Sequence, residues 1–122
     1  MKFLVVDDSP TMRRIVTNAL GEIGYSDVVE AGDGQEAMQQ LTSASFDFLV
    51  TDWNMPNMNG LELTEAVRQH ADYASLPILM VTTRGMKEDV MSAMHAGVNN
   101  FMVKPFTSEV LREKIDMILK TA

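Results

Sequence analysis

Cysteine is missing from this chain of 122 residues. Its absence excludes disulfide bonds, thiolate metal sites and catalysis by a thiol, and it fits a reducing compartment. Long apolar runs are missing too, since none exceeds about six residues, whereas a membrane-spanning helix needs about 18 or more. The apolar start, residues 1–6, meets Asp7 too early for a signal peptide. We therefore expect a cytoplasmic protein that does not bind a membrane.

An excess of positive charge is also missing, because the formal net charge is −7. Phosphate backbones attract clustered Lys and Arg, so we expect no nonspecific binding to nucleic acid. The charge is uneven: residues 1–83 hold 12 acidic and 4 basic side chains, and residues 84–122 hold 5 and 6. Two interpretations stay open, a chance scatter of solvated charges and a division between an acidic site and a partner-binding face.

The length and the composition are typical of one compact globular domain. Hydrophobic residues make up 46% of the chain and charged residues 22%, which is ordinary for such a domain. The sequence shows no repeat, low-complexity tract or linker. We therefore expect a single monomeric domain over residues 1–122, with no appended output domain.

Short apolar runs rich in Val, Ile, Leu and Phe alternate with segments whose apolar residues recur every three or four positions. The runs predict five strands, at residues 3–6, 28–31, 48–51, 78–82 and 101–103. The segments predict five helices, at residues 10–23, 35–41, 61–70, 87–96 and 108–119. Strict alternation predicts an α/β fold, with parallel strands joined by right-handed crossovers and helices on both faces of the sheet.

The ends of the predicted helices carry the expected residue types. Ser9 and Thr107 are typical N-caps, and Pro10 suits the first helical position. Gly24 and Gly97 stand where helix ends need left-handed backbone.

Polar side chains stand at the carboxyl ends of the predicted strands, where open parallel sheets bind their ligands. The first strand runs into Asp7 and Asp8, the third into Asp52, the fourth ends in Thr82, and Lys104 follows the fifth. We expect these side chains to converge on one edge of the sheet.

Three carboxylates held within about 4 to 6 Å repel one another, so they must be protonated, paired or occupied by a cation. Mg²⁺ fits, because it prefers carboxylate and water oxygens, and neither His70 nor His95, which fall on predicted helices, offers a softer ligand here. A carboxylate beside Mg²⁺, a cation and a hydroxyl is equipped to attack phosphorus and form an acyl phosphate. A single strand-end aspartate is more often a cap or turn residue, but the joint placement favours the phosphoacceptor interpretation.

The sequence resembles the receiver domains of two-component response regulators, and among them most closely the single-domain chemotaxis regulators. The likeness runs nearly end to end, through "KFLVVDD", "TMRRIV", "DWNMPNMNGLEL", "LPILMVT" and "VKPFT". It implies a flavodoxin-like, doubly wound (βα)5 fold with a five-stranded parallel sheet in the order 2-1-3-4-5, which is a property of that family rather than of the pattern.

The resemblance also implies a role for each strand-end residue. Asp52 would accept a phosphoryl group from a histidine kinase of the CheA type. Mg²⁺ would be bound by Asp8, Asp52 and the backbone carbonyl of Asn54, with Asp7 acting mainly through a coordinated water. Thr82 and Lys104 would contact the phosphoryl oxygens, and the Lys104–Pro105 bond would be cis.

The chain departs from the family pattern at several positions. Phe101 stands where chemotaxis regulators often carry a tyrosine, and we expect it to move from an exposed to a buried rotamer on phosphorylation. Arg84 and Asn54 flank the phosphoryl group and are expected to set its lifetime. Asn59 replaces a common aspartate.

Methionine is frequent, with 11 residues, and adaptable methionine surfaces bind varied peptides, although most methionines fill gaps in cores. In the predicted helix 87–96 and just before it, Met86, Val90 and Met94 share one face, which we expect to be buried. Met91 then lies near its edge and joins Thr82 and Phe101 in the expected output region.

The leading functional prediction is a phosphorylation-switched binding module whose target is a protein such as the flagellar motor switch, with a phosphatase as a further partner. A phosphate sink, or a receiver for another apparatus such as pili, is the alternative. An aspartyl-phosphate phosphatase acting on external substrates would need an aspartate where Asn54 stands, and a flavin phosphate would be repelled by "DDSPT". We therefore expect no enzyme activity beyond the chain's own phosphorylation and dephosphorylation.

Overall fold

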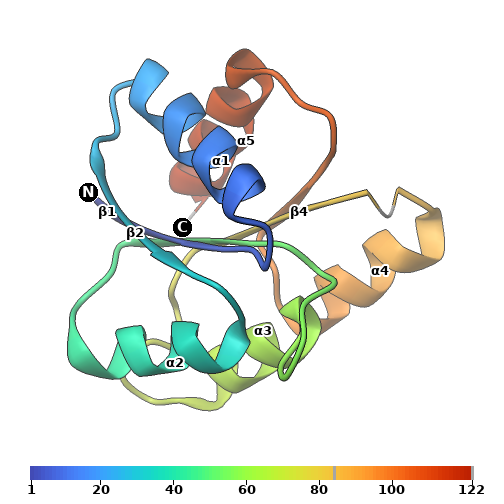
Figure 1. Cartoon of the computed structure of the whole chain (residues 1–122). Coiled ribbons are helices and arrows are strands. Elements are labelled where there is room, and N and C mark those ends of the chain that lie inside the picture. Colours follow the sequence, from blue (N-terminus) through green and yellow to red (C-terminus); the bar gives the residue numbers. More distant parts are fainter. Residues whose placement is uncertain (84, 122) are drawn as a thin grey trace.

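Five strands and five helices alternate along residues 1–83 and 85–121, which the computed structural model describes (Figure 1). The strands are β1 (Lys2–Val6), β2 (Asp27–Ala31), β3 (Phe48–Thr51), β4 (Ile78–Thr82) and β5 (Asn100–Val103). The helices are α1 (Pro10–Glu22), α2 (Gly34–Ser43), α3 (Gly60–Gln69), α4 (Lys87–Ala96) and α5 (Ser108–Thr121). Every predicted element is confirmed, with ends that differ by one or two residues where they differ at all.

The strands form one parallel sheet in the order β2-β1-β3-β4-β5, which confirms the order implied by the family. The interior strand β1 pairs with β2 on one side and with β3 on the other. In this register Val6 lies between Ala31 and Thr51. The residues that follow these positions, Asp7 and Asp52 among them, therefore leave the sheet side by side.

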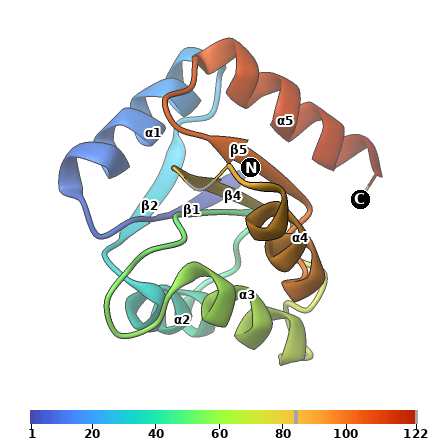
Figure 2. The same ribbon diagram turned by 90° about the vertical axis from the view of Figure 1, so that its right-hand side faces the viewer.

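Helices cover the sheet on both faces (Figures 1 and 2). Alternate strand residues point to opposite sides: Phe3 and Val5 pack into a core under α1 and α5, whereas Leu4 and Val6 pack into a core under α2, α3 and α4. The edge strand β2 differs, because Asp27 and Glu30 are exposed and its two valines are half-buried. The prediction that helices cover the strands on both faces thus holds for β1, β3 and β4. It fails for most of β2, an edge strand that pairs with one neighbouring strand alone.

The predicted helix ends are confirmed. The Ser9 hydroxyl accepts a hydrogen bond of 3.2 Å from the backbone N–H of Met12, and Thr107 does the same for Val110 at 3.2 Å. Gly97 ends α4 with a φ of 118°, and Gly24 follows α1 with a φ of 101°, in the region that favours glycine. The Lys104–Pro105 bond is cis, as expected.

The predicted buried face of α4 is wrong. The exposed fractions of Met86 and Met94 are 67% and 47%, while Ala93 is fully buried and Val90 is half-buried. The helix packs on α3 and β5, and the small Ala93 side chain lets it lie close to them where a methionine would hold it away. The longer side chains, including Met91, are left at the surface.

No helix among the described residues is both long enough and apolar enough to cross a membrane.

Candidate metal and phosphoacceptor site

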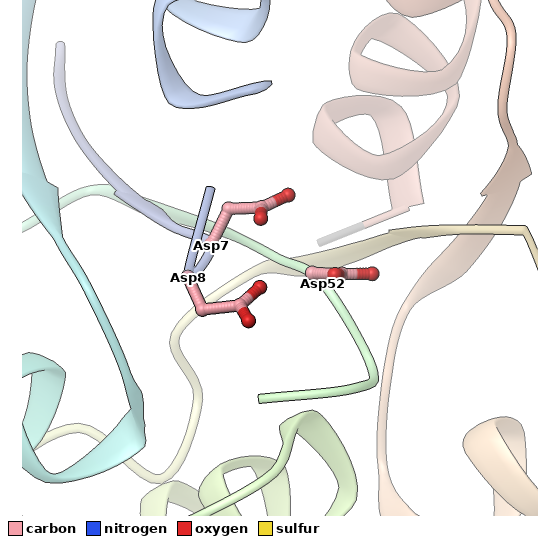
Figure 3. Close-up of side chains that lie close together, drawn as sticks. All are labelled: Asp7, Asp8 and Asp52. Atoms are coloured by element: carbon pink, nitrogen blue, oxygen red, sulfur yellow. The ribbon is translucent and has the colours of Figure 1, made fainter. Parts of the chain in front are cut away.

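Three carboxylates meet at the carboxyl edge of the sheet (Figure 3). Asp7 and Asp8 follow β1, and Asp52 follows β3. One oxygen from each lies within 4.8 Å of the others. Asp7 is buried, Asp52 is half-buried and Asp8 is exposed. The predicted convergence of these side chains is therefore confirmed.

Asp7 is held through all four of its polar atoms. Its N–H donates to the Ala31 carbonyl at 3.2 Å, and its Oδ1 accepts the Ser9 N–H at 2.9 Å. Its Oδ2 accepts the Lys104 ammonium at 3.1 Å, and its backbone carbonyl accepts an Arg13 guanidinium N–H at 2.7 Å. The Asp7 carboxylate is thus fixed in place by the protein itself, whereas the Asp8 carboxylate faces solvent and is accessible to a cation.

Asp52 is oriented by its own loop. The N–H of Trp53 donates to Asp52 Oδ1 at 2.8 Å, and the Lys104 ammonium lies 3.5 Å from the same oxygen. Burial, with a smaller contribution from the Asp7 charge, raises the pKa of Asp52, against the opposing effect of Lys104 and of the Trp53 N–H. Ionising Asp52 therefore costs more here than in water, and additional positive charge beside it would lower that cost.

Lys104 lies between the carboxylates of Asp7 and Asp52, closer to Asp7 than to Asp52. Its backbone N–H donates to the Thr82 carbonyl at 2.8 Å, which ties the residue after β5 to the end of β4. Among the described residues it places one positive charge against the three negative charges of the cluster. The donors are all carboxylate oxygens, and Mg²⁺ prefers such a set over the nitrogen and sulfur ligands that zinc favours. The residues present thus fit Mg²⁺.

The loop between β3 and α3 carries Asn54 past the carboxylates. Its end is fixed by Gly60, where a Cβ atom would overlap the Asp52 carbonyl oxygen and whose N–H donates to the Trp53 carbonyl at 2.8 Å. Asn59 caps α3 and exchanges hydrogen bonds with Glu62 in a capping box. This is the local function of Asn59, at the position where the family often has aspartate.

The same loop is also held from α2. The Asp33 carboxylate accepts the Asn57 side-chain amide at 2.7 Å, and the Gly34 N–H donates to the Met58 carbonyl at 3.2 Å. Asn57 has a φ of 66°, a left-handed conformation that asparagine tolerates better than most residues. Asn54 is exposed two residues after Asp52, and its backbone carbonyl as a metal ligand stays a prediction.

Thr82 is fully buried at the end of β4, two residues beyond the pairing of Met80 with Phe101. The expectation that Phe101 starts from an exposed rotamer is wrong for this structure. Its ring is 7% exposed and packs in the core shared by α3 and α4. Phenylalanine has no hydroxyl to hydrate, and burying such a ring stabilises a protein by about 1.5 to 3 kcal/mol. Burial is therefore its favoured position without phosphorylation.

Two further predicted positions remain, Arg84 and Met91. Arg84 falls outside the described residues. Met91 lies on α4 with 61% of its surface exposed, so it belongs to the molecular surface rather than to the carboxylate cluster.

Sequence reasoning missed Arg13 and Gly60. Arg13 follows the two aspartates on the second turn of α1, and Gly60 opens α3. Neither residue type marks a site by itself. The register of β1, β2 and β3 is needed to see that both contact the backbone of an acidic residue.

The chain is similar to proteins of a known family. The model of the response regulator receiver domain matches residues 3–116. The chain is 53% identical over 122 residues to the chemotaxis protein CheY1 of Helicobacter pylori, covering 99% of this chain and 98% of that protein. It is 55% identical over 122 residues to the CheY homolog of Campylobacter jejuni, covering 99% and 94%. The structure of chemotaxis protein CheY4 of Vibrio cholerae matches with a TM-score of 0.88 at 38% identity, covering 96% and 97%.

Proposed function

Because the chain belongs to the response regulator receiver domain family, we propose that it is a phosphorylation-switched signalling protein of a chemotaxis pathway. The observation that carries this proposal is the group of Asp7, Asp8 and Asp52, with Lys104 between two of its members. The chemotaxis context comes from the names of the relatives. We place the protein in the cytoplasm as a monomer.

The acidic group binds Mg²⁺ in this proposal. Asp8, Asp52 and the Asn54 carbonyl supply direct ligands, and Asp7, whose oxygens already hold Ser9 and Lys104, acts through a coordinated water. When bound, Mg²⁺ offsets the negative charge that gathers on the transferring phosphoryl oxygens.

Asp52 accepts the phosphoryl group from a phosphohistidine of a CheA-type kinase. The Trp53 N–H orients Oδ1, so Oδ2 attacks the phosphorus. An O–P bond forms while the N–P bond breaks, and the electron pair of that bond stays on the imidazole nitrogen, which takes a proton from solvent. Lys104 then pairs with a phosphoryl oxygen, and the Thr82 hydroxyl donates to another.

The target binds the face formed by α4, β5 and α5. This face carries several apolar side chains at the surface, namely Met86, Met91, Met94, Val103 and Val110. It belongs to the near-neutral part of the chain, where repulsion of an acidic partner is small. A flagellar motor switch protein is the proposed target, while Asn54 and Arg84 set the lifetime of the phosphoryl group and a separate phosphatase shortens it.

A phosphate sink, or a receiver for a non-flagellar output such as pili, is the second candidate. The burial of Phe101 favours it, because an aromatic ring that is already buried leaves less of the expected rotation to signal with. Turnover of external phosphomonoesters is not proposed, since Asn54 lacks the carboxyl group such an enzyme needs as acid or base.

Phosphorylation tests the proposal. We expect acetyl phosphate or a CheA-type kinase with Mg²⁺ to place an acid-stable, base-labile phosphoryl group on wild type. Asp52→Asn should remove it, and EDTA should abolish it. Asp27→Asn, which removes an exposed carboxylate at the far end of β2, is the matched control and should be labelled like wild type. Full labelling of Asp52→Asn would refute the proposed site.

A further inference from the structure

The Arg13 side chain contacts the backbone of the acidic turn that follows β1. Among the described residues, it does not contact a carboxylate of the metal site. One guanidinium N–H donates to the Asp7 carbonyl at 2.7 Å, and Nε donates to Glu30 Oε1 at 3.1 Å. We propose that Arg13 is a positioning residue for the metal site: it fixes the turn after β1 so that Asp8 faces Asp52 before a metal binds.

The guanidinium bridges two segments that are far apart in the sequence. Glu30 lies on β2 opposite Val5 of β1, so the ion pair anchors the first turns of α1 to the sheet edge. A Cβ at Gly32 would lie 3.7 Å from the same guanidinium, and the Arg13 side chain is 20% exposed. Arg13 therefore occupies a narrow space between the turns that follow β1 and β2.

The contact with the Asp7 carbonyl has a direct geometric consequence for Asp8. The peptide unit is planar, so the Asp7 carbonyl and the Cα of Asp8 lie in one plane. Fixing the oxygen fixes that plane, and with it the point from which the Asp8 side chain starts. Lys104 restrains the Asp7 carboxylate from the other side, but it has no such hold on the backbone of the turn.

A restraint is needed because the carboxylates repel one another. One oxygen from each lies within 4.8 Å of the others, and if the turn were not fixed, the exposed Asp8 would swing away from the group when no cation is bound. A turn that opened in this way would have to be reordered at each binding event, at the expense of metal affinity. Residues behind the ligands of a metal site typically change its affinity 10- to 100-fold when mutated.

The charge of Arg13 and its positioning of Asp8 have opposite effects on the affinity for a cation, which makes the proposal testable. Removing a positive charge beside a cation site strengthens cation binding by simple electrostatics. Losing the orientation of Asp8 weakens it. Arg14 is the matched control, because it is the next residue on the same helix, carries the same charge and is exposed.

The experiment measures the Mg²⁺ dissociation constant at fixed ionic strength for wild type, Arg13→Met, Arg13→Lys and Arg14→Met. Calorimetry is one readout. The fluorescence of Trp53 is another readout, since Trp53 is the single tryptophan and its backbone N–H donates to Asp52. We expect Arg13→Met to bind Mg²⁺ roughly tenfold more weakly than Arg14→Met. Arg13→Lys, which keeps the charge and the helix propensity but not the two-sided contact, should lie between them.

Melting in EDTA shows whether each variant is folded. If Arg13→Met does not fold, the Mg²⁺ affinity of Arg13→Lys tests the proposal instead. This inference rests on the proposed magnesium site, and the two fail in different ways. Equal or tighter Mg²⁺ binding by both Arg13 variants, relative to Arg14→Met, would overturn the role of Arg13 alone. A wild-type protein that does not bind Mg²⁺ would overturn the proposed function as well.

Discussion

Asp7, Asp8 and Asp52 carry the same side chain in three different environments. The Asp7 carboxylate is buried and bonded on both oxygens, the Asp8 carboxylate is exposed, and Asp52 is half-buried beside Lys104. The three aspartates therefore differ in their proposed roles because their environments differ. Asp7 holds Lys104, Asp8 meets the cation, and Asp52 attacks phosphorus.

The raised pKa of Asp52 predicts that this residue destabilises the metal-free protein at neutral pH. Below its unfolded pKa, near 3.8, Asp52 is protonated in both states and costs nothing. As pH rises from there through the higher folded pKa, the unfolded state releases its proton first, and the free energy of unfolding falls. Asp52→Asn keeps an acceptor for the Trp53 N–H and has no charge to bury.

We therefore expect Asp52→Asn in EDTA to melt higher than wild type at pH 7, and the difference to vanish near pH 3. Asp27→Asn should show no comparable gain. Thermal unfolding at a series of pH values measures both. A lower melting temperature of Asp52→Asn at pH 7 would show that Asp52 is not strained in the metal-free state.

At the scale of elements, the start of α2 supports the loop that carries Asn54. Asp33 caps this helix by accepting the Glu36 N–H at 2.8 Å, and its other oxygen accepts the Asn57 amide. These two bonds, the first one foremost, lower the pKa of Asp33. Its stabilising effect is thus present above the unfolded pKa and is lost as pH falls through the lower folded pKa.

Asp33→Ala should cost about 1 kcal/mol in the free energy of unfolding at pH 7, the usual effect of losing an N-cap. Asp33→Asn retains a good cap and should cost less. Urea unfolding measures the difference between wild type and Asp33→Ala. This difference should shrink as the pH is lowered below 4, which is close to the ordinary pKa of an aspartate. A difference that grows toward acid would contradict the assigned contacts.

The orientation of α4 was not predictable from hydrophobic periodicity. Met86, Val90 and Met94 form one apolar stripe, and Val90 with Ala93 forms another, so the sequence of the helix alone favours the stripe with the larger side chains. The structure buries Ala93, because the space between α3 and β5 accepts a small residue. The helix itself was predictable to the residue, since its limits follow local signals such as Gly97.

Two substitutions on α4 test this orientation. Ala93→Leu should overpack the interface and cost about 1 to 3 kcal/mol in the free energy of unfolding. Met94→Ala, one residue further on and 47% exposed, should stay within about 0.5 kcal/mol of wild type. Urea unfolding of both variants decides between the two stripes, and a reversed order of the two costs would restore the Met86 and Met94 face as the buried one.

At the scale of the whole molecule, the parallel sheet brings the site together. Strand ends that are 45 residues apart in the chain (Val6 and Thr51) or 31 residues apart (Thr51 and Thr82) become neighbours, because β1, β3 and β4 lie side by side with their carboxyl ends at one edge. This convergence was predictable from the alternation of strands and helices. The contacts of Arg13 and the burial of Phe101 were not, since each depends on the register and on packing between elements.

Phosphorylation of Asp52 is proposed to change the affinity of this domain for its target. A ligand shifts a two-state protein only through its different affinity for the two states, so target binding and phosphorylation must favour one another. Allosteric coupling of this kind is typically about 1 to 3 kcal/mol.

The most direct measurement is a titration of the protein with a short amphipathic segment of a motor switch protein, with and without Mg²⁺ and beryllofluoride, which mimics the phosphoryl group on Asp52. We expect the treated protein to bind roughly 5- to 150-fold more tightly, and Asp52→Asn to show no change on treatment. Equal affinity with and without beryllofluoride in wild type would contradict the claim and would favour a phosphate sink or a different output.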